Sequence, residues 1–139
     1  MSFTQTKPVA QRILVVDDEP FVCESVKMLL AYDGHAVETA GSGKEALAKY
    51  DAAKFDLVIT DYSMEGMKGD QLAQAIKRLA PDKPIILLTA FPPEHKPDGI
   101  DLVLTKPFYF DTLREALAAM RVWKPAEIGG AEVVEPFIR

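Results

Sequence analysis

Five short apolar runs, separated by segments of helical or turn composition, constrain the fold of this 139-residue chain more than any other feature. The first run, residues 13–16 (ILVV), is continuous rather than alternating, which is typical of a strand buried on both faces of a parallel sheet. Because helical patterns follow most of the runs, we predict a parallel α/β sheet with right-handed crossovers and helices on both faces. The remaining runs lie at 36–39, 55–60, 85–89 and 100–104.

The helices predicted between these runs begin at residues that are typical of helix starts. Pro20 is tolerated in a first helical turn, and Ser42 with Glu45 three residues later has the capping-box pattern. Asp70 is expected to start the next helix, and Asp111 can cap the last one.

A proline-rich segment interrupts this alternation between Thr89 and Lys106. Residues 91–99 contain three prolines and a glycine, and a proline inside a helix costs about 3 kcal/mol or more. We therefore predict that the fourth helix is short or missing. If the five-stranded parallel sheet is of the flavodoxin-like, doubly wound type, its strand order is 2-1-3-4-5. The predicted organisation is an N-terminal tail at 1–11, one domain at 12–122 and a C-terminal tail at 123–139.

Composition narrows the class of protein. Apolar residues make up 48% of the chain and charged residues 27%, which is an ordinary globular balance. The net charge of −5, without a basic cluster, argues against direct nucleic-acid binding. No stretch has the length of a membrane span or the pattern of a signal peptide, so we expect a cytoplasmic protein without a membrane partner. Cys23 is expected in the core, and His35 and His95 on the solvated surface.

Polar residues stand where the predicted strands end. Asp17 and Asp18 follow the first run, Asp61 the third, Thr89 closes the fourth and Lys106 follows the fifth. Because ligands of open parallel sheets bind outside the carboxyl ends of the strands, these side chains should converge at one edge. Three close carboxylates need a cation, and oxygen ligands favour a hard ion such as Mg²⁺. Asp61 would then be placed to accept a phosphoryl group as an acyl phosphate.

Four sequence pieces, each at a strand end, resemble the receiver domain of two-component response regulators. They are residues 15–20 (VVDDEP), 61–69 (DYSMEGMKG), 89–90 (TA) and 106–108 (KPF), and the resemblance covers about residues 12–120. The resemblance implies that Asp61 is the site phosphorylated by a histidine kinase. It also implies that Asp18, Asp61 and the backbone carbonyl of Ser63 ligate Mg²⁺, with Asp17 acting on the ion mainly through water.

The same resemblance assigns Thr89 and Lys106 to sensing the phosphoryl group. The chain departs from the family at Val103, where an aromatic residue is usual, and in the shortened segment before Lys106. The expected partners are a sensor histidine kinase or a histidine phosphotransfer protein, an output protein that the sequence does not name, and a second copy in a weak homodimer. The chain would be a stand-alone receiver or a fragment of a larger regulator or hybrid kinase, a phosphoryl acceptor rather than an enzyme.

Two other functions stay open at the level of sequence. A Mg²⁺-dependent phosphatase with an aspartyl-phosphate intermediate would need a second acid two residues after Asp61, where the chain has Ser63. A pseudo-receiver, a binding module that has lost the switch, would not need the full set of pocket residues. The pseudo-receiver stays open as far as signalling to an output protein is concerned, because Val103 and the shortened segment depart from the family there.

Overall fold

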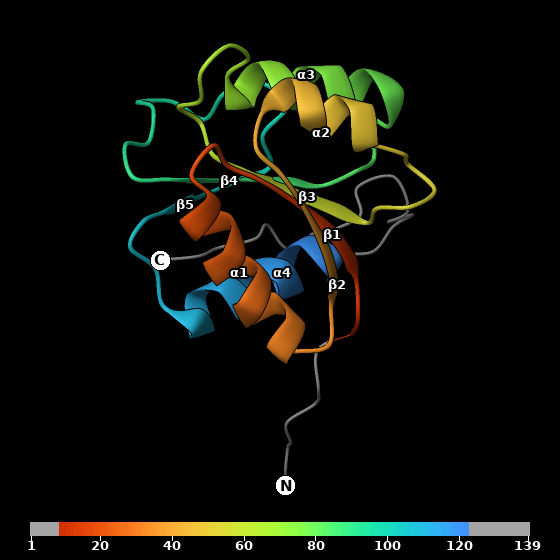
Figure 1. Ribbon diagram of the computed structural model, residues 1–139, viewed down its shortest axis with the longest axis vertical. Coiled ribbons are helices and arrows are strands. Elements are labelled where there is room, and N and C mark those ends of the chain that lie inside the picture. The colour runs from red at the N-terminus through yellow and green to blue at the C-terminus, as the bar shows by residue number, and fades with distance from the viewer. Residues whose placement is uncertain (1–8, 123–139) are drawn as a thin grey trace, which may run out of the picture.

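The computed structural model describes residues 9–122, which form one parallel sheet flanked by helices (Figure 1). The strands are β1 (Arg12–Val16), β2 (Ala36–Ala40), β3 (Leu57–Thr60), β4 (Ile85–Thr89) and β5 (Leu102–Thr105). The helices are α1 (Pro20–Tyr32), α2 (Gly43–Lys49), α3 (Gly69–Leu79) and α4 (Phe110–Val122). All neighbouring strands are parallel and the order is β2-β1-β3-β4-β5, which confirms the predicted flavodoxin-like topology. The predicted C-terminal tail, 123–139, lies outside the described residues.

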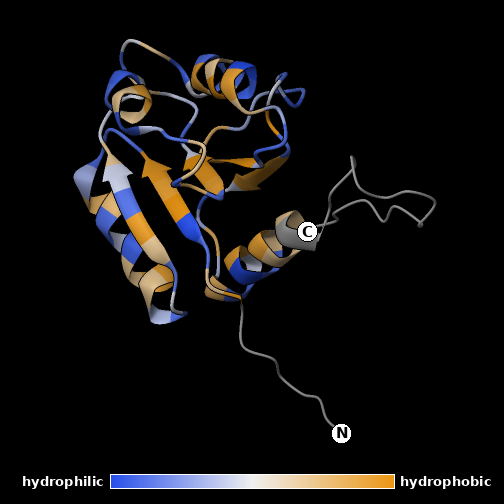
Figure 2. Cartoon of the chain, turned by 90° about the vertical axis from the view of Figure 1, so that its right-hand side faces the viewer, coloured by the Kyte–Doolittle hydropathy of each residue, from blue (hydrophilic) through white to orange (hydrophobic). Residues whose placement is uncertain are grey.

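Two hydrophobic clusters hold the layers together, one on each face of the sheet. Alternate residues of β1 face opposite sides, so Ile13 packs with α1 and α4 whereas Leu14 packs with α2 and α3. Figure 1 shows the two helix pairs on opposite sides of the sheet, and Figure 2 shows that most strand residues are hydrophobic. Burying one such aliphatic side chain is worth about 1.5 to 3 kcal/mol, so a continuous apolar run stabilises both layers at once.

The helix starts follow the sequence signals, with one-residue differences. Ser42 caps α2 as predicted, because its side chain accepts a hydrogen bond from the Glu45 N–H. α3 begins one residue before Asp70, at Gly69. The prediction that Asp111 caps the last helix is wrong, because α4 begins at Phe110. Asp111 lies in the first turn instead, where a carboxylate interacts favourably with the helix dipole.

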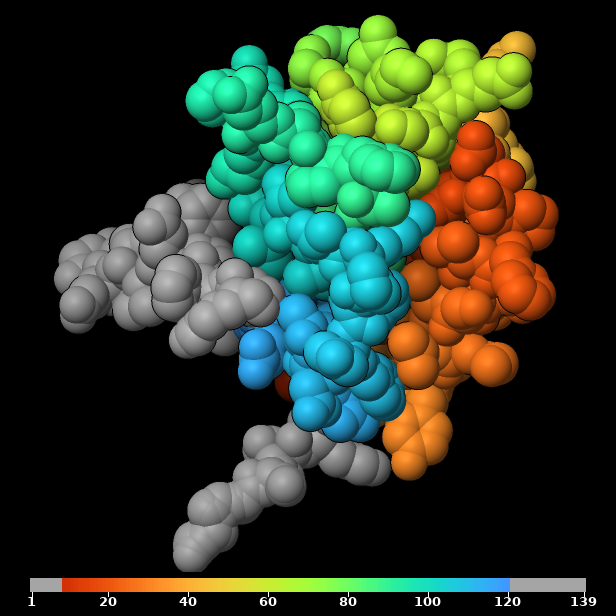
Figure 3. Space-filling view, turned by 90° about the vertical axis from the view of Figure 1, so that its left-hand side faces the viewer, coloured from red at the N-terminus to blue at the C-terminus, as the bar shows by residue number. Residues whose placement is uncertain are grey.

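No helix forms between β4 and β5 in the part of the chain that the structure describes, which confirms the predicted loss of the fourth helix. The label α4 therefore belongs to the helix after β5. The intervening loop packs against α3, since a Cβ at Gly99 would lie 3.3 Å from the backbone of Ala73. Figure 3 shows this teal segment against the green residues above it. Lys77 anchors the far end of the loop, because its Nζ lies 2.8 Å from Asp101 Oδ2.

The predicted solvated position of His35 is wrong, whereas His95 is exposed as predicted. His35 is only 7% exposed, and its Nδ1 accepts a hydrogen bond of 3.0 Å from the Gln11 N–H. The turn at Gly34, with φ of 91°, returns the chain sharply after α1 and brings His35 against the segment that leads into β1. Burial lowers the pKa of His35 below its ordinary value.

This burial predicts a pH dependence of stability. The folded pKa of His35 lies below the ordinary value of 6.5, so the unfolded chain binds more protons between these two values. The free energy of unfolding should therefore fall on acidification from neutral pH toward pH ~5. We expect His35→Asn, which keeps an acceptor but does not titrate, to show a shallower slope in urea unfolding. The exposed control His95→Asn should retain the slope, and equal slopes for all three proteins would contradict the assignment.

Candidate functional site

The polar residues predicted to converge are carried to the carboxyl edge of the sheet by its own hydrogen bonds. Sheet-like bonding continues one residue past the strands: the Asp61 N–H donates to the Val16 carbonyl at 2.9 Å, and the Lys106 N–H donates to the Thr89 carbonyl at 2.8 Å. The Asp17 N–H likewise donates to a carbonyl at the end of β2, at 3.1 Å. Backbone hydrogen bonds therefore fix the positions of Asp17, Asp61 and Lys106 independently of any contact that their side chains make.

Three carboxylates meet at this edge. Asp17, Asp18 and Asp61 each offer an oxygen, and these oxygens lie within 4.8 Å of one another. Asp17 is 3% exposed and Asp61 9%, whereas Asp18 is exposed. The first two are held by backbone amides as well, because the Glu19 N–H donates to Asp17 Oδ1 at 2.9 Å and the Tyr62 N–H donates to Asp61 Oδ1 at 2.8 Å.

Lys106 supplies the positive charge beside this cluster. Its Nζ lies 3.0 Å from Asp17 Oδ2 and 4.0 Å from Asp61 Oδ1. A single ammonium group therefore stands between two carboxylates from different strands. One positive charge against three negative charges leaves the cluster electrostatically undercompensated.

The charge state of Asp61 reflects that imbalance. Burial is the largest cause that raises the pKa of Asp61 above its ordinary value, and the charge of Asp17 raises it further. Lys106, the Tyr62 amide and the Thr89 hydroxyl act in the opposite direction without cancelling the rise. A divalent cation would favour the negatively charged form of Asp61 and so offset the cost of burying that charge beside Asp17. The donor set consists of oxygens alone, two of them on nearly buried carboxylates, so the residues fit a hard ion such as Mg²⁺.

The two other predicted site residues occupy different environments. Thr89 is 1% exposed at the end of β4, and its Oγ1 accepts the Phe91 N–H at 3.3 Å. Ser63 is exposed on the loop that follows Asp61. Its backbone carbonyl stays a predicted ligand. The structure thus brings Asp17, Asp18, Asp61 and Lys106 together, with Thr89 beside them.

Two features of the site were missed at the level of sequence. The Tyr62 amide that orients Asp61 carries no sequence signal, because any residue except proline has that N–H. Gly69 did carry a signal, as a glycine where α3 begins. A Cβ there would lie 2.2 Å from the Asp61 carbonyl oxygen, so α3 approaches the acceptor backbone as closely as it does only because residue 69 has no side chain.

Fold and site together define a flavodoxin-like α/β domain with an acidic pocket at the carboxyl edge of its sheet. The chain belongs to the response regulator receiver domain family, whose sequence profile matches residues 13–118. Its relatives of this kind are response regulators of two-component systems.

Individual relatives agree with this assignment. The transcriptional regulatory protein GlrR of Escherichia coli is 38% identical over 112 residues, which cover 76% of this chain and 25% of GlrR. The response regulator TrrA of Thermotoga maritima, solved in complex with Mg²⁺-BeF, is 39% identical with a TM-score of 0.73, and the match covers 79% of this chain and 98% of TrrA. A second structure holds TrrA in complex with the histidine kinase ThkA, with a TM-score of 0.72. The chain spans less than half the length of the curated relatives it matches.

No helix in residues 9–122 is long and apolar enough to cross a membrane.

Proposed function

We propose that Asp61 accepts a phosphoryl group and that the domain acts as the phosphorylated switch of a two-component system. The observation that carries this proposal is the position of Asp61: its carboxylate is nearly buried, shares a cluster with Asp17 and Asp18, and lies 4.0 Å from the only ammonium group near it among the described residues. The domain that carries this switch spans residues 12–122 in our proposal, and the protein acts in the cytoplasm.

The transfer step follows from the chemistry of the acceptor. An oxygen of Asp61 attacks the phosphorus of a phosphohistidine, the P–N bond breaks, and an acyl phosphate forms while the imidazole nitrogen recovers its lone pair and takes a proton. Lys106 balances charge on the phosphoryl oxygens, and the Thr89 hydroxyl donates a hydrogen bond to one of them. Mg²⁺, held by Asp18, Asp61, the Ser63 carbonyl and, through water, Asp17, would supply further neutralisation when bound.

A protein is the proposed phosphodonor, because exposed aromatic side chains follow the strand ends that carry the site. Phe21, Phe91 and Tyr109 are 83%, 79% and 81% exposed, a few residues beyond the ends of β1, β4 and β5. Large exposed apolar side chains at the same edge as a reactive group are typical of a protein contact surface. The solved complex of TrrA with the histidine kinase ThkA supports a histidine kinase as the proposed class of partner.

The alternative functions have less support. A phosphatase with an aspartyl-phosphate intermediate would need an acid near Asp61 to protonate a leaving group, and the exposed residue two positions later is Ser63. A pseudo-receiver would not require Lys106 to lie between Asp17 and Asp61, as it does here. We therefore propose acceptance of the phosphoryl group without steady turnover of phosphoesters.

Incubation with Mg²⁺ and acetyl phosphate, followed by intact-protein mass spectrometry, tests this function. We expect one phosphoryl adduct on the unsubstituted protein, none on Asp61→Asn and none when Mg²⁺ is chelated, because the acceptor carboxylate and the ion are both required. Asp82→Asn, which changes an exposed aspartate outside the site, should still form the adduct. An adduct that persists in Asp61→Asn, or its absence from the unsubstituted protein, would refute the proposal.

A further inference from the structure

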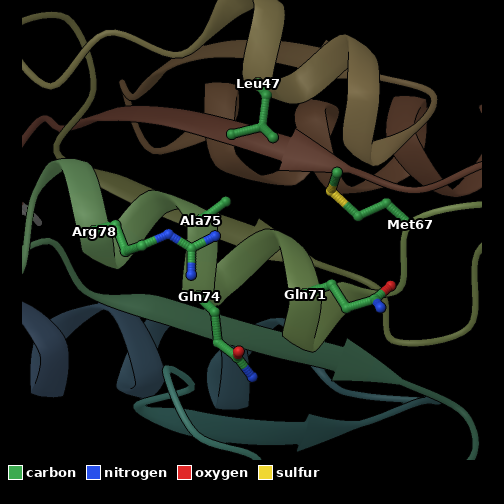
Figure 4. A pocket seen from close by; sticks show the side chains of 6 residues that line it. All are labelled: Leu47, Met67, Gln71, Gln74, Ala75 and Arg78. Atoms are coloured by element: carbon green, nitrogen blue, oxygen red, sulfur yellow. The ribbon is translucent and has the colours of Figure 1, made fainter.

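An open groove lies between α2 and α3, on the side of the sheet that carries these two helices. Its volume is about 530 Å³, and Figure 4 shows that Leu47 points toward α3 from α2, that Met67 comes from the loop before α3, and that the other lining residues lie on α3. The lining residues are Leu47, Met67, Gln71, Gln74, Ala75 and Arg78. None of these residues belongs to the phosphoryl-acceptor site, so binding in the groove would not depend on the proposed function.

The floor of the groove is apolar and held in place. Leu47, Met67 and Ala75 are half-buried, and the first two pack against the cluster between the sheet and the α2–α3 layer. Gly43 fixes Met67 from the α2 side, because a Cβ at residue 43 would lie 2.8 Å from both Cβ and Sδ of Met67. The floor is therefore a preformed surface, and docking on it would cost little reorganisation.

The rim of the groove offers hydrogen-bond donors and a positive charge. Gln71, Gln74 and Arg78 are exposed along α3, and the Gln71 Oε1 accepts the Lys68 N–H at 2.8 Å. Arg78 makes no ion pair with any residue of the described range 9–122, whereas the neighbouring Lys77 is engaged by Asp101. A guanidinium group has only donors, in a planar fork that matches a carboxylate.

We propose that this α2–α3 groove docks a segment of a partner protein that presents an apolar side chain next to a carboxylate. The apolar side chain would lie between Leu47 and Met67, and the carboxylate would pair with Arg78. Small-molecule sites are usually pockets that bury most of the ligand. This groove is open along α3, so it is better suited to a peptide segment, such as an amphipathic helix, than to a small molecule. Arg78, which has no ion-pair partner among residues 9–122, puts a positive charge on the rim of the groove, and this charge favours an acidic occupant.

An NMR titration tests the proposal. The probe is a short blocked peptide with leucine and glutamate at helical spacing, added to the isotope-labelled protein up to ~1 mM, where a weak interaction is measurable. We expect the largest shifts at Leu47, Met67 and Ala75. The same peptide with lysine in place of glutamate should bind at least about tenfold more weakly, because the pairing with Arg78 is replaced by repulsion.

Two protein variants separate the groove from general charge effects. Arg78→Gln removes the rim charge and should weaken binding of the acidic peptide by about tenfold. Lys27→Gln removes the same charge from an exposed position on α1, on the opposite side of the sheet, and should leave binding unchanged. Absence of shifts, shifts centred on another surface, equal affinities of the two variants, or shifts explained by self-association would each overturn the proposal.

Discussion

In the absence of divalent cations, Asp61→Asn is expected to unfold at a higher urea concentration than the unsubstituted protein. The substitution removes one of three negative charges whose oxygens lie within 4.8 Å, and it removes the carboxylate whose pKa is raised by burial and by Asp17. Repulsion between two charges at this separation is about 3 kcal/mol in a medium of intermediate dielectric, and Lys106 offsets part of it. A net gain of about 1 to 2 kcal/mol in the free energy of unfolding should remain.

The stability advantage of Asp61→Asn over the unsubstituted protein should shrink when Mg²⁺ is added and when the pH is lowered. A bound ion stabilises only the folded state that binds it, so Mg²⁺ should raise the urea midpoint of the unsubstituted protein more than that of Asp61→Asn. The folded pKa of Asp61 lies above its unfolded value of 3.8, so protonation on acidification relieves the repulsion in that window. The advantage of the variant should therefore shrink as pH falls toward 3.8.

The exposed control Asp82→Asn should change neither the midpoint nor its response to Mg²⁺. If Asp61→Asn were no more stable than this control without cations, the carboxylates would not repel one another as the geometry requires. That result would leave the phosphorylation experiment unaffected, because acceptance of a phosphoryl group depends on the presence of the carboxylate and not on its cost to stability.

Much of the fold could be predicted because the sheet is parallel and central. Continuous apolar runs mark strands buried on both faces. β1, β2 and β4 lie within one residue of the predicted runs, whereas β3 begins two residues after the start of its run. β5 was less accurate, since Ile100 lies before the strand although it is buried. Burial alone does not distinguish a strand from the loop that leads into it. The missing helix was predicted because proline acts locally, through its fixed φ and absent N–H.

The side chains of the site could also be predicted, but not the contacts that orient them. Strand ends and topology place Asp17, Asp61 and Lys106 at one edge, whatever the rest of the sequence is. The Tyr62 amide and the burial of His35 depend on tertiary approach, to which a pattern of residue types along the chain is insensitive. A histidine in a turn has the same sequence signature whether it is solvated or accepts a buried N–H.

The departures from the family do not change the residues of the acceptor cluster itself. Val103 is half-buried against the α2–α3 layer, and the segment that would hold a helix beside it is a loop. We therefore expect the pocket to accept the phosphoryl group as in the family. We expect the contact with an output partner to use a surface other than the one around the missing helix. The loop from Asp61 to α3 connects the acceptor site directly to the α2–α3 groove, because Met67 near its end forms part of the floor of that groove.

Gly69→Ala is expected to be the most damaging small substitution in the described part of the chain. A Cβ at residue 69 would lie 2.2 Å from the carbonyl oxygen of Asp61 and 3.0 Å from the backbone of Tyr62. Neither neighbour is a flexible side chain, so the backbone of the acceptor loop or the start of α3 must move. We expect a loss of roughly 3 kcal/mol or more in the free energy of unfolding, the upper range for overpacking.

Steric overlap and helix propensity predict opposite effects of Gly69→Ala on the free energy of unfolding. Alanine forms helix better than glycine by about 1 kcal/mol, so helix propensity alone predicts that Gly69→Ala stabilises the first turn of α3. Gly41→Ala is the matched control: its new Cβ would meet only Glu45 Oε1, at the ordinary contact distance of 3.5 Å, and urea unfolding should change little. A Gly69→Ala protein as stable as this control would mean that α3 does not approach the acceptor as closely as described. A destabilised variant that also forms the phosphoryl adduct more slowly would tie the packing of α3 to the geometry of Asp61.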